Sequence, residues 1–170
     1  MEANTILQPV IVRGLWSGIM MIWMYATRIP AIAGANIPEN DLGHPVGMSY
    51  LPSHVRRVAD NHNHLFEQPS LFYATCIAIA VAGHADATAV NAAWGFVILR
   101  AVHSLIQSTV NVVVLRFGIF MLSWLALLAL LALLALLALL AREALAIFKR
   151  HIGVILGIGG NCGIRKSARG

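Results

Sequence analysis

Charged residues are scarce in this chain. Asp, Glu, Lys and Arg make up only 11% of its 170 residues, against roughly 25% in soluble domains. Hydrophobic residues make up 59%, and the mean hydropathy is +0.77. This shortage of charge excludes an ordinary soluble domain and is typical of a protein embedded in a lipid bilayer, and the length suits one domain.

Cysteine is rare as well, and the basic residues are not arranged for nucleic acid. Cys76 lies in an apolar segment and Cys162 in the tail, so their spacing predicts neither a disulfide framework nor a metal site. Six of the twelve Lys and Arg residues fall in the last 29 residues, and no basic stripe is interleaved with aromatic side chains. We therefore expect no metal and no nucleic-acid partner.

Four apolar stretches predict an all-α integral membrane four-helix bundle. The last runs from Phe117 to Ala141, 25 residues without a charge, or about 37 Å, which is enough to cross a bilayer with tilt. The short turn at 83–86 makes the second and third helices antiparallel neighbours. The expected ranges of the first three helices are roughly Ile6–Ile29, His54–Gly83 and Thr88–Leu115.

An arginine divides the first stretch. Gly14–Thr27 alone is 14 residues, or about 21 Å, which is too short to span. Arg13 therefore either snorkels to the nearer interface or faces other helices. A cleaved signal peptide is the competing interpretation, because Ala31-Ile32-Ala33 resembles a cleavage site. The acidic Glu2 and the lack of a basic residue before Arg13 favour an uncleaved anchor instead.

The sequence from Leu125 onward offers no candidate catalytic or binding residues. Leu125–Ala141 is a Leu-Ala-Leu triplet repeat, whose alanines drift by about 60° per repeat and form no fixed face, so we expect a lipid-facing helix. The tail is basic, and its glycine-rich stretch at 157–161 lacks the Lys-Ser/Thr of a phosphate-binding loop. We predict a membrane domain over residues 1–141 and a tail over 142–170.

Polar side chains gather where the second stretch begins. Asp60–Pro69 holds seven polar residues in ten, and positions 60, 63, 64 and 67 share one face of a helix. Polar groups at the mouth of a membrane segment are costly unless they are paired or face a wet cavity, so these are candidates for a site. The alternative is a solvated turn beside the membrane. The face consists of Asp60, Asn63, His64 and Glu67.

A polar stripe also runs along the third helix. Arg100, His103, Gln107 and Asn111 lie within about 80° of each other, and Ser104 lies about 20° beyond one edge of this arc. An arginine buried in a membrane span needs a partner, for which the second helix offers Glu67 or Asp60. A clamp that only holds helices together is the alternative interpretation.

These polar groups converge at one depth. In a four-span bundle the entry of the second helix, the exit of the third and the entry of the fourth, at Arg116, share one membrane face. Arginines bind carboxylates and acidic side chains bind ammonium groups, so the mixture predicts a site for a small zwitterionic or anionic ligand.

Three pieces of the chain carry a family resemblance. They are Arg56-Arg57 to His64-Leu65-Phe66-Glu67-Gln68-Pro69, Leu99-Arg100-Ala101-Val102-His103-Ser104, and Asn111 to Arg116-Phe117. Together they resemble the MAPEG family, the membrane-associated proteins in eicosanoid and glutathione metabolism. The resemblance covers about residues 5–125. It implies a four-helix membrane bundle that forms a homotrimer and binds glutathione between subunits near the cytosolic face.

The resemblance also implies roles for individual residues. Glu67 matches a glutamate that contacts glutathione, Arg100 and His103 match an Arg-x-x-His motif, and Arg116 matches the arginine that activates the glutathione thiol. The chain departs from the pattern at four positions. His64 stands where the family often has Asn, Gln107 where some enzymes have Tyr, and Phe117 and Phe120 where some have Ser and Tyr. Prostaglandin-type isomerase chemistry is therefore not expected.

We predict a glutathione transferase or peroxidase that acts on apolar electrophiles arriving from the lipid. The alternatives are a non-catalytic binding or assembly protein and a small transporter. The expected catalytic residue is Arg116. The expected substrate-binding residues are Arg57, Asn63, His64, Glu67, Arg100, His103, Gln107 and Asn111.

The resemblance to bacterial members predicts a multi-pass protein of the bacterial inner membrane. Arg28, Arg56, Arg57 and Arg116 indicate a cytoplasmic face at the site, whereas the six basic residues of the tail argue for the opposite orientation. The orientation of the family that the chain resembles favours a cytoplasmic face at the site.

Overall fold

The described residues of the computed structural model form five helices and no strand. The structure describes residues 3–35, 37, 41, 49–67 and 69–155. The helices are α1 (Ala3–Gly34), α3 (Ser53–Glu67), α4 (Pro69–Val81), α5 (Ala87–Ser108) and α6 (Val113–Ile155). Among these described residues, three stretches are long and apolar enough to cross a membrane, namely Thr5–Gly34, Ala87–Ser108 and Val113–Ile152.

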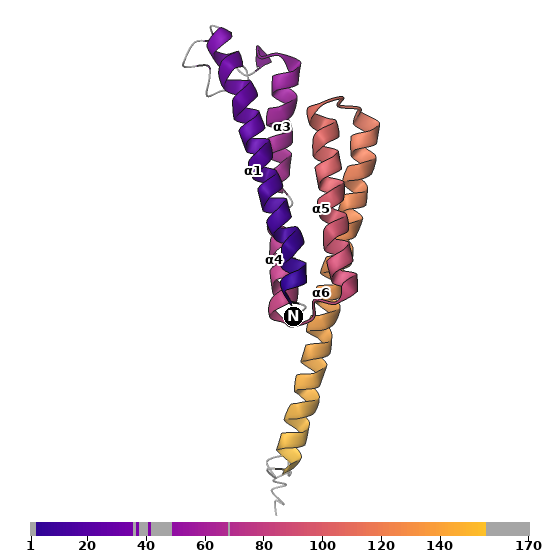
Figure 1. Ribbon diagram of the computed structural model, residues 1–170. Helices are drawn as coiled ribbons and strands as arrows, with labels where there is room; N and C mark the ends of the chain where they lie inside the picture. The colour runs from indigo at the N-terminus through magenta and orange to yellow at the C-terminus, as the bar shows by residue number, and fades with distance from the viewer. Residues whose placement is uncertain (1–2, 36, 38–40, 42–48, 68, 156–170) are drawn as a thin grey trace, which may run out of the picture. The chain divides into compact units, whose positions relative to one another are not determined.

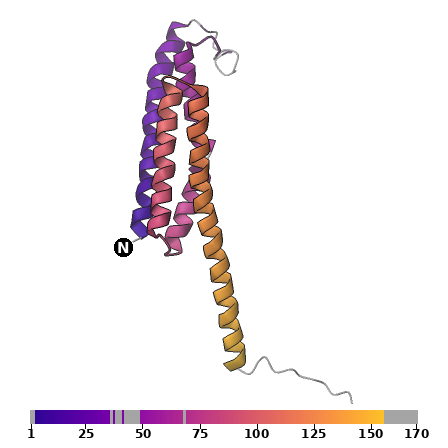
Figure 2. The ribbon, with the colours of Figure 1, turned by 90° about the vertical axis from the view of Figure 1, so that its right-hand side faces the viewer.

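The chain divides into two compact units, Met1–Leu134 and Ala135–Gly170. Within the first unit, α1 packs against α3, α4 and α5, and α3 also packs against α5. Figures 1 and 2 show α3 and α4 following one another along α1. In the second unit, the described residues continue the helical conformation of α6, and most of their side chains are exposed.

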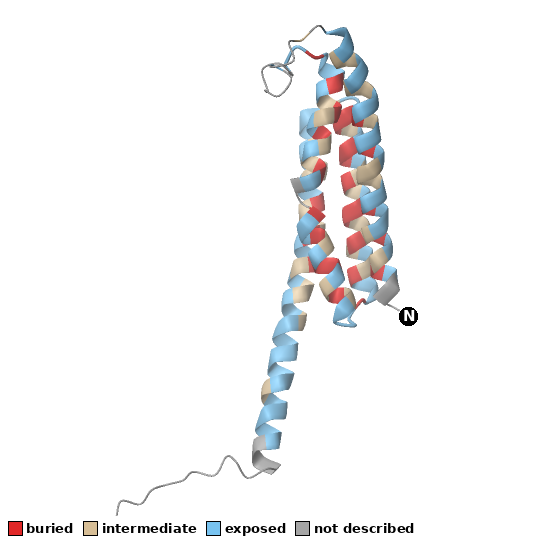
Figure 3. Cartoon of the chain, turned by 90° about the vertical axis from the view of Figure 1, so that its left-hand side faces the viewer, coloured by how far each residue is buried: buried red, intermediate tan, exposed pale blue. Residues whose placement is uncertain are grey.

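The apolar core lies between the helices of the first unit, where Figure 3 shows the buried positions. The rings of Phe72 on α4 and Phe96 on α5 stack with their centroids 4.5 Å apart. Ala89 and Ala93 on α5 are fully buried, and small side chains of this kind let membrane helices approach closely. Asp86 begins α5 by accepting a hydrogen bond from the Ala89 backbone N–H at 2.8 Å.

The described parts of the predicted second helix, His54–Gly83, are α3 and α4. α3 ends at Glu67 and α4 begins at Pro69, and Gln68 between them lies outside the described residues. α4 ends at Val81, two residues before the expected end. Proline has no N–H, and its ring clashes with the carbonyl four residues earlier, so it cannot continue an α-helix without disturbance.

The boundaries of the other helices differ from the prediction as well. α5 ends at Ser108 rather than near Leu115, and Asn111 has a φ of 52°, a left-handed conformation that Asn tolerates better than most residues. α6 therefore begins at Val113, and Arg116 lies near its start. α1 continues past the expected end at Ile29 to Gly34, with Pro30 inside it.

Candidate functional site

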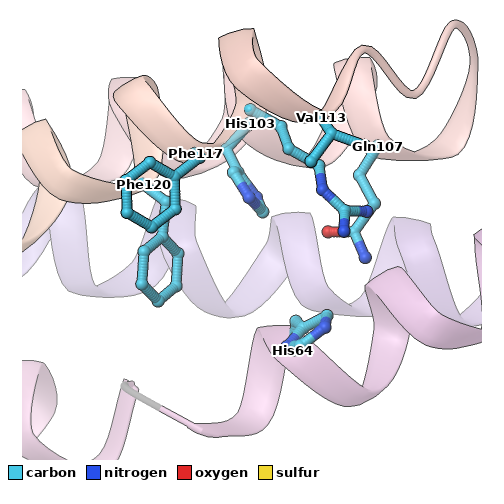
Figure 4. A pocket seen from close by; sticks show the side chains of 7 residues that line it. His64, His103, Gln107, Val113, Phe117 and Phe120 are labelled. Atoms are coloured by element: carbon cyan, nitrogen blue, oxygen red, sulfur yellow. The ribbon is translucent and has the colours of Figure 1, made fainter.

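Three helices line a partly open cavity of about 190 Å³ within the first unit. α3 contributes His64, α5 contributes His103 and Gln107, and the beginning of α6 contributes the rest of the wall. Figure 4 shows His64 on one side of this cavity, facing His103 and Gln107 on the other. The α6 residues of the wall are Val113, Arg116, Phe117 and Phe120.

Arg116 is held in the cavity wall from the preceding turn. Its Nη1 donates a hydrogen bond to Oδ1 of Asn111 at 2.8 Å, and the side chain is half-buried. The prediction that Asn111 lies on the polar stripe of α5 is wrong, because α5 has already ended. The left-handed conformation of Asn111 instead places its amide against the arginine, so Asn111 orients the guanidinium.

Arg100 lies behind the cavity and is fully buried. Its Nη2 donates to the backbone carbonyl oxygen of His64 at 2.7 Å, and its guanidinium carbon lies 5.5 Å from the centroid of the Phe120 ring, a cation–π distance. Arg100 therefore connects α5 to one residue of the cavity wall on α3 and to another on α6.

The stripe on α5 presents two further polar side chains to the cavity. The His103 ring lies 5.6 Å from the Phe120 ring, tilted by 47°. Gln107 is 2% exposed, and its Oε1 has no hydrogen-bond partner among the described residues. A buried acceptor without a donor is uncommon in folded proteins, so this oxygen is a natural contact for a ligand N–H.

The predicted face of α3 separates into residues that reach the cavity and residues that do not. Asp60 and Asn63 are exposed, and Arg57 is half-buried away from the cavity wall. Among the side chains of α3 that the structure describes, only His64 lines the cavity. Glu67 is the last residue of α3, and its side chain lies outside the described part of the chain.

Sequence reasoning missed Asn61. This residue is fully buried, and its Nδ2 donates to Oγ of Ser104 on α5 at 2.7 Å. The bond joins the two helices one turn away from the pair His64 and His103. The sequence carried a signal for it, because Asn61 lies three residues before His64 and so on the same side of a helix. The predicted polar face, made of residues 60, 63, 64 and 67, did not include it.

No group of three or more His, Cys, Asp or Glu side chains in the described part of the chain is placed to hold a metal ion. What the cavity offers is a guanidinium, two imidazoles and an amide beside two phenyl rings. Such a lining can bind an anion or a zwitterion and can place an apolar group against the rings.

The cavity lies inside a stretch that resembles other proteins. The model of one family, described as the MAPEG family, matches residues 6–136, which include every residue that lines the cavity. No curated protein and no solved structure matches the chain.

Proposed function

Because the chain belongs to the MAPEG family, we propose that it binds glutathione in the cavity between α3, α5 and α6 and activates its thiol. The match confirms the resemblance and the all-α membrane bundle predicted from the sequence. Together with the three apolar spans, it makes the chain a multi-pass membrane protein of a family in eicosanoid and glutathione metabolism.

The observation that carries the proposal is the position of Arg116. Its guanidinium lines the cavity, and Asn111 holds one of its nitrogens. An arginine close to a thiol stabilises the thiolate, which is the nucleophilic form of sulfur. In the proposed reaction the thiol gives its proton to water, and the thiolate sulfur then forms a bond to the electrophilic carbon of an apolar substrate that arrives from the bilayer. The bond from that carbon to its leaving group, a halide in the test substrate, breaks, and the halide ion departs with the bonding electrons. Many members of the family are glutathione transferases or peroxidases.

The other polar groups suit the remainder of glutathione, which carries two carboxylates, an ammonium group and two amides. Oε1 of Gln107, which has no partner in the part of the chain that the structure describes, can accept from an amide N–H, and His64 and His103 offer imidazole nitrogens. We further propose that three copies of the chain assemble, as the family resemblance implies, and that Arg57, Asn63 and Glu67 bind glutathione at the interface between copies.

A second candidate function is glutathione binding without catalysis. Phe117 and Phe120 bring no hydroxyl group to the cavity, so Arg116 acts without a neighbouring hydrogen-bond donor from these two positions. A binding or assembly protein would retain the polar clamp between the helices and bind glutathione, but it would not turn over an electrophile.

A titration of the purified, detergent-solubilised protein with glutathione tests both candidates. We expect saturable binding, an ultraviolet thiolate signal, and conjugation of a generic aromatic halide. Binding without conjugation would favour the second candidate. A flat titration would exclude glutathione as the ligand.

The same titration on Gln107→Leu tests the proposed amide contact. One lost hydrogen bond contributes about 0.5–1.5 kcal/mol, so glutathione should bind roughly 2- to 12-fold more weakly. The matched control is Ser108→Ala on the same helix, because the Ser108 Oγ is also buried without a partner among the described residues but does not line the cavity. Equal effects of the two changes would contradict the contact.

We propose that the protein lies in the bacterial inner membrane with the site at the cytoplasmic face. Arg28, Arg56, Arg57 and Arg116 support this orientation by the positive-inside rule. Four passes then put the tail on the periplasmic side. A reporter fused to the C-terminus should be active only outside the cytoplasm, and cytoplasmic activity would reverse the assignment.

A further inference from the structure

Two buried arginines from different helices donate to consecutive carbonyl oxygens in the last turn of α3. Arg13 on α1 donates through Nη2 to the carbonyl of Leu65 at 3.0 Å, and Arg100 on α5 donates through Nη2 to the carbonyl of His64 at 2.7 Å. Both side chains are 0% exposed. Arg13 faces other helices and does not snorkel, which answers the question that its place in the sequence left open.

The carbonyl of Leu65 needs a hydrogen-bond donor from outside its own helix, because a proline stands four residues later. In an α-helix it would accept from the N–H of the residue four positions later, which is Pro69. Proline has no N–H, and its ring pushes this carbonyl away from the helix axis. In a bilayer such freed groups must be satisfied by neighbouring helices. Arg13 supplies the missing bond.

The surroundings of Arg13 fit this role. Its Nη1 donates to Oγ of Ser17, one turn further along α1, which holds the guanidinium in place. A cavity of about 280 Å³, lined by residues that include Ser17, Leu65 and Pro69, lies beside the hydrogen bond from Arg13 to Leu65. Both of these acceptors, the Ser17 hydroxyl and the Leu65 carbonyl, are uncharged oxygens. A leucine would enter the membrane far more easily, so insertion and apolar packing do not explain an arginine at this position.

We infer that Arg13 is a positioning residue for the cavity between α3, α5 and α6. By replacing the N–H that Pro69 lacks, it fixes the last turn of α3 and with it His64, which is adjacent to Leu65 and lines the cavity. The effect of Arg13 on glutathione binding rests on the proposed function. Its effect on the position of His64 does not.

The test exploits the fact that alanine at position 69 restores a backbone N–H. Arg13→Leu should weaken glutathione binding about tenfold, which corresponds to about one lost charge-assisted hydrogen bond. In Arg13→Leu/Pro69→Ala the affinity should return to within about twofold of wild type, because α3 can then complete its own bond. Arg13→Leu/Pro30→Ala is the matched control, since Pro30 lies inside α1 and not opposite Leu65. Its glutathione affinity should stay as low as that of Arg13→Leu.

A second measurement does not depend on glutathione. The ring signals of His64 in an NMR spectrum, assigned with His64→Gln, should shift in Arg13→Leu and return in Arg13→Leu/Pro69→Ala. Unmoved His64 signals, or no recovery in the double variant, would overturn the inference whether or not the protein binds glutathione. If wild type fails to bind glutathione while the His64 signals behave as expected, the proposed function is wrong and the positioning role stands.

Discussion

Arg116→Ala is expected to abolish the ultraviolet signal of the glutathione thiolate and to slow conjugation by roughly 100- to 1,000-fold, the usual effect of removing one preorganised donor from a reacting anion. Arg116 donates its hydrogen bond to Asn111, only five residues earlier. Because this bond joins no distant helices, the variant should keep the fold and the assembly of wild type. Stopped-flow absorbance and size-exclusion chromatography would measure the two properties.

Two further variants make the Arg116 result specific. Arg116→Lys keeps the charge but loses the planar fork that holds Asn111 and the sulfur together, so a partial thiolate signal is expected. Arg142→Ala removes an exposed arginine from the second unit and should leave the signal unchanged. A full thiolate signal in Arg116→Ala would show that another group activates the thiol.

Arg100→Leu is expected to weaken glutathione binding by roughly 10- to 100-fold, because a hydrogen bond from a charged donor contributes about 1.5–3 kcal/mol. Arg100 contacts the cavity wall on both sides, through the His64 carbonyl and the Phe120 ring. Losing it frees α3 and α6 to shift relative to one another. Insertion should not suffer, since leucine at a span centre is favoured over arginine by about 3 kcal/mol. Titration and membrane fractionation would separate the two effects.

The glutathione affinity of Arg100→Lys should fall between those of wild type and Arg100→Leu. An ammonium group can donate to the carbonyl, but it lacks the planar guanidinium that reaches the His64 carbonyl and the Phe120 ring together. If Arg100→Leu binds glutathione as wild type does while its assembly weakens, Arg100 is a clamp between helices and has no part in the site. This is the alternative that the sequence left open.

The residues near the cavity show how far a helical pattern predicts a site. His103 and Gln107 lie where a period of 3.6 residues on α5 put them, and both line the cavity. The same pattern failed for Asn111, because it could not foresee that α5 ends at Ser108. It also failed for Asn61, because the choice between two adjacent faces of α3 depends on where α5 packs. Periodicity assigns a side chain to a face, and only the neighbouring helices decide what that face meets.

By itself the sequence determined that the chain is all-α, enters a membrane, belongs among MAPEG proteins and carries its polar groups on the second, third and fourth stretches. These properties depend on composition and local spacing, which any chain displays before it folds. The tertiary structure alone decided that Arg13 faces inward, that Asn111 holds Arg116, and that two arginines donate to the end of α3. The reason is that a backbone group freed by a proline or a helix end accepts whichever donor lies nearest, and packing brings that donor from a distant part of the chain.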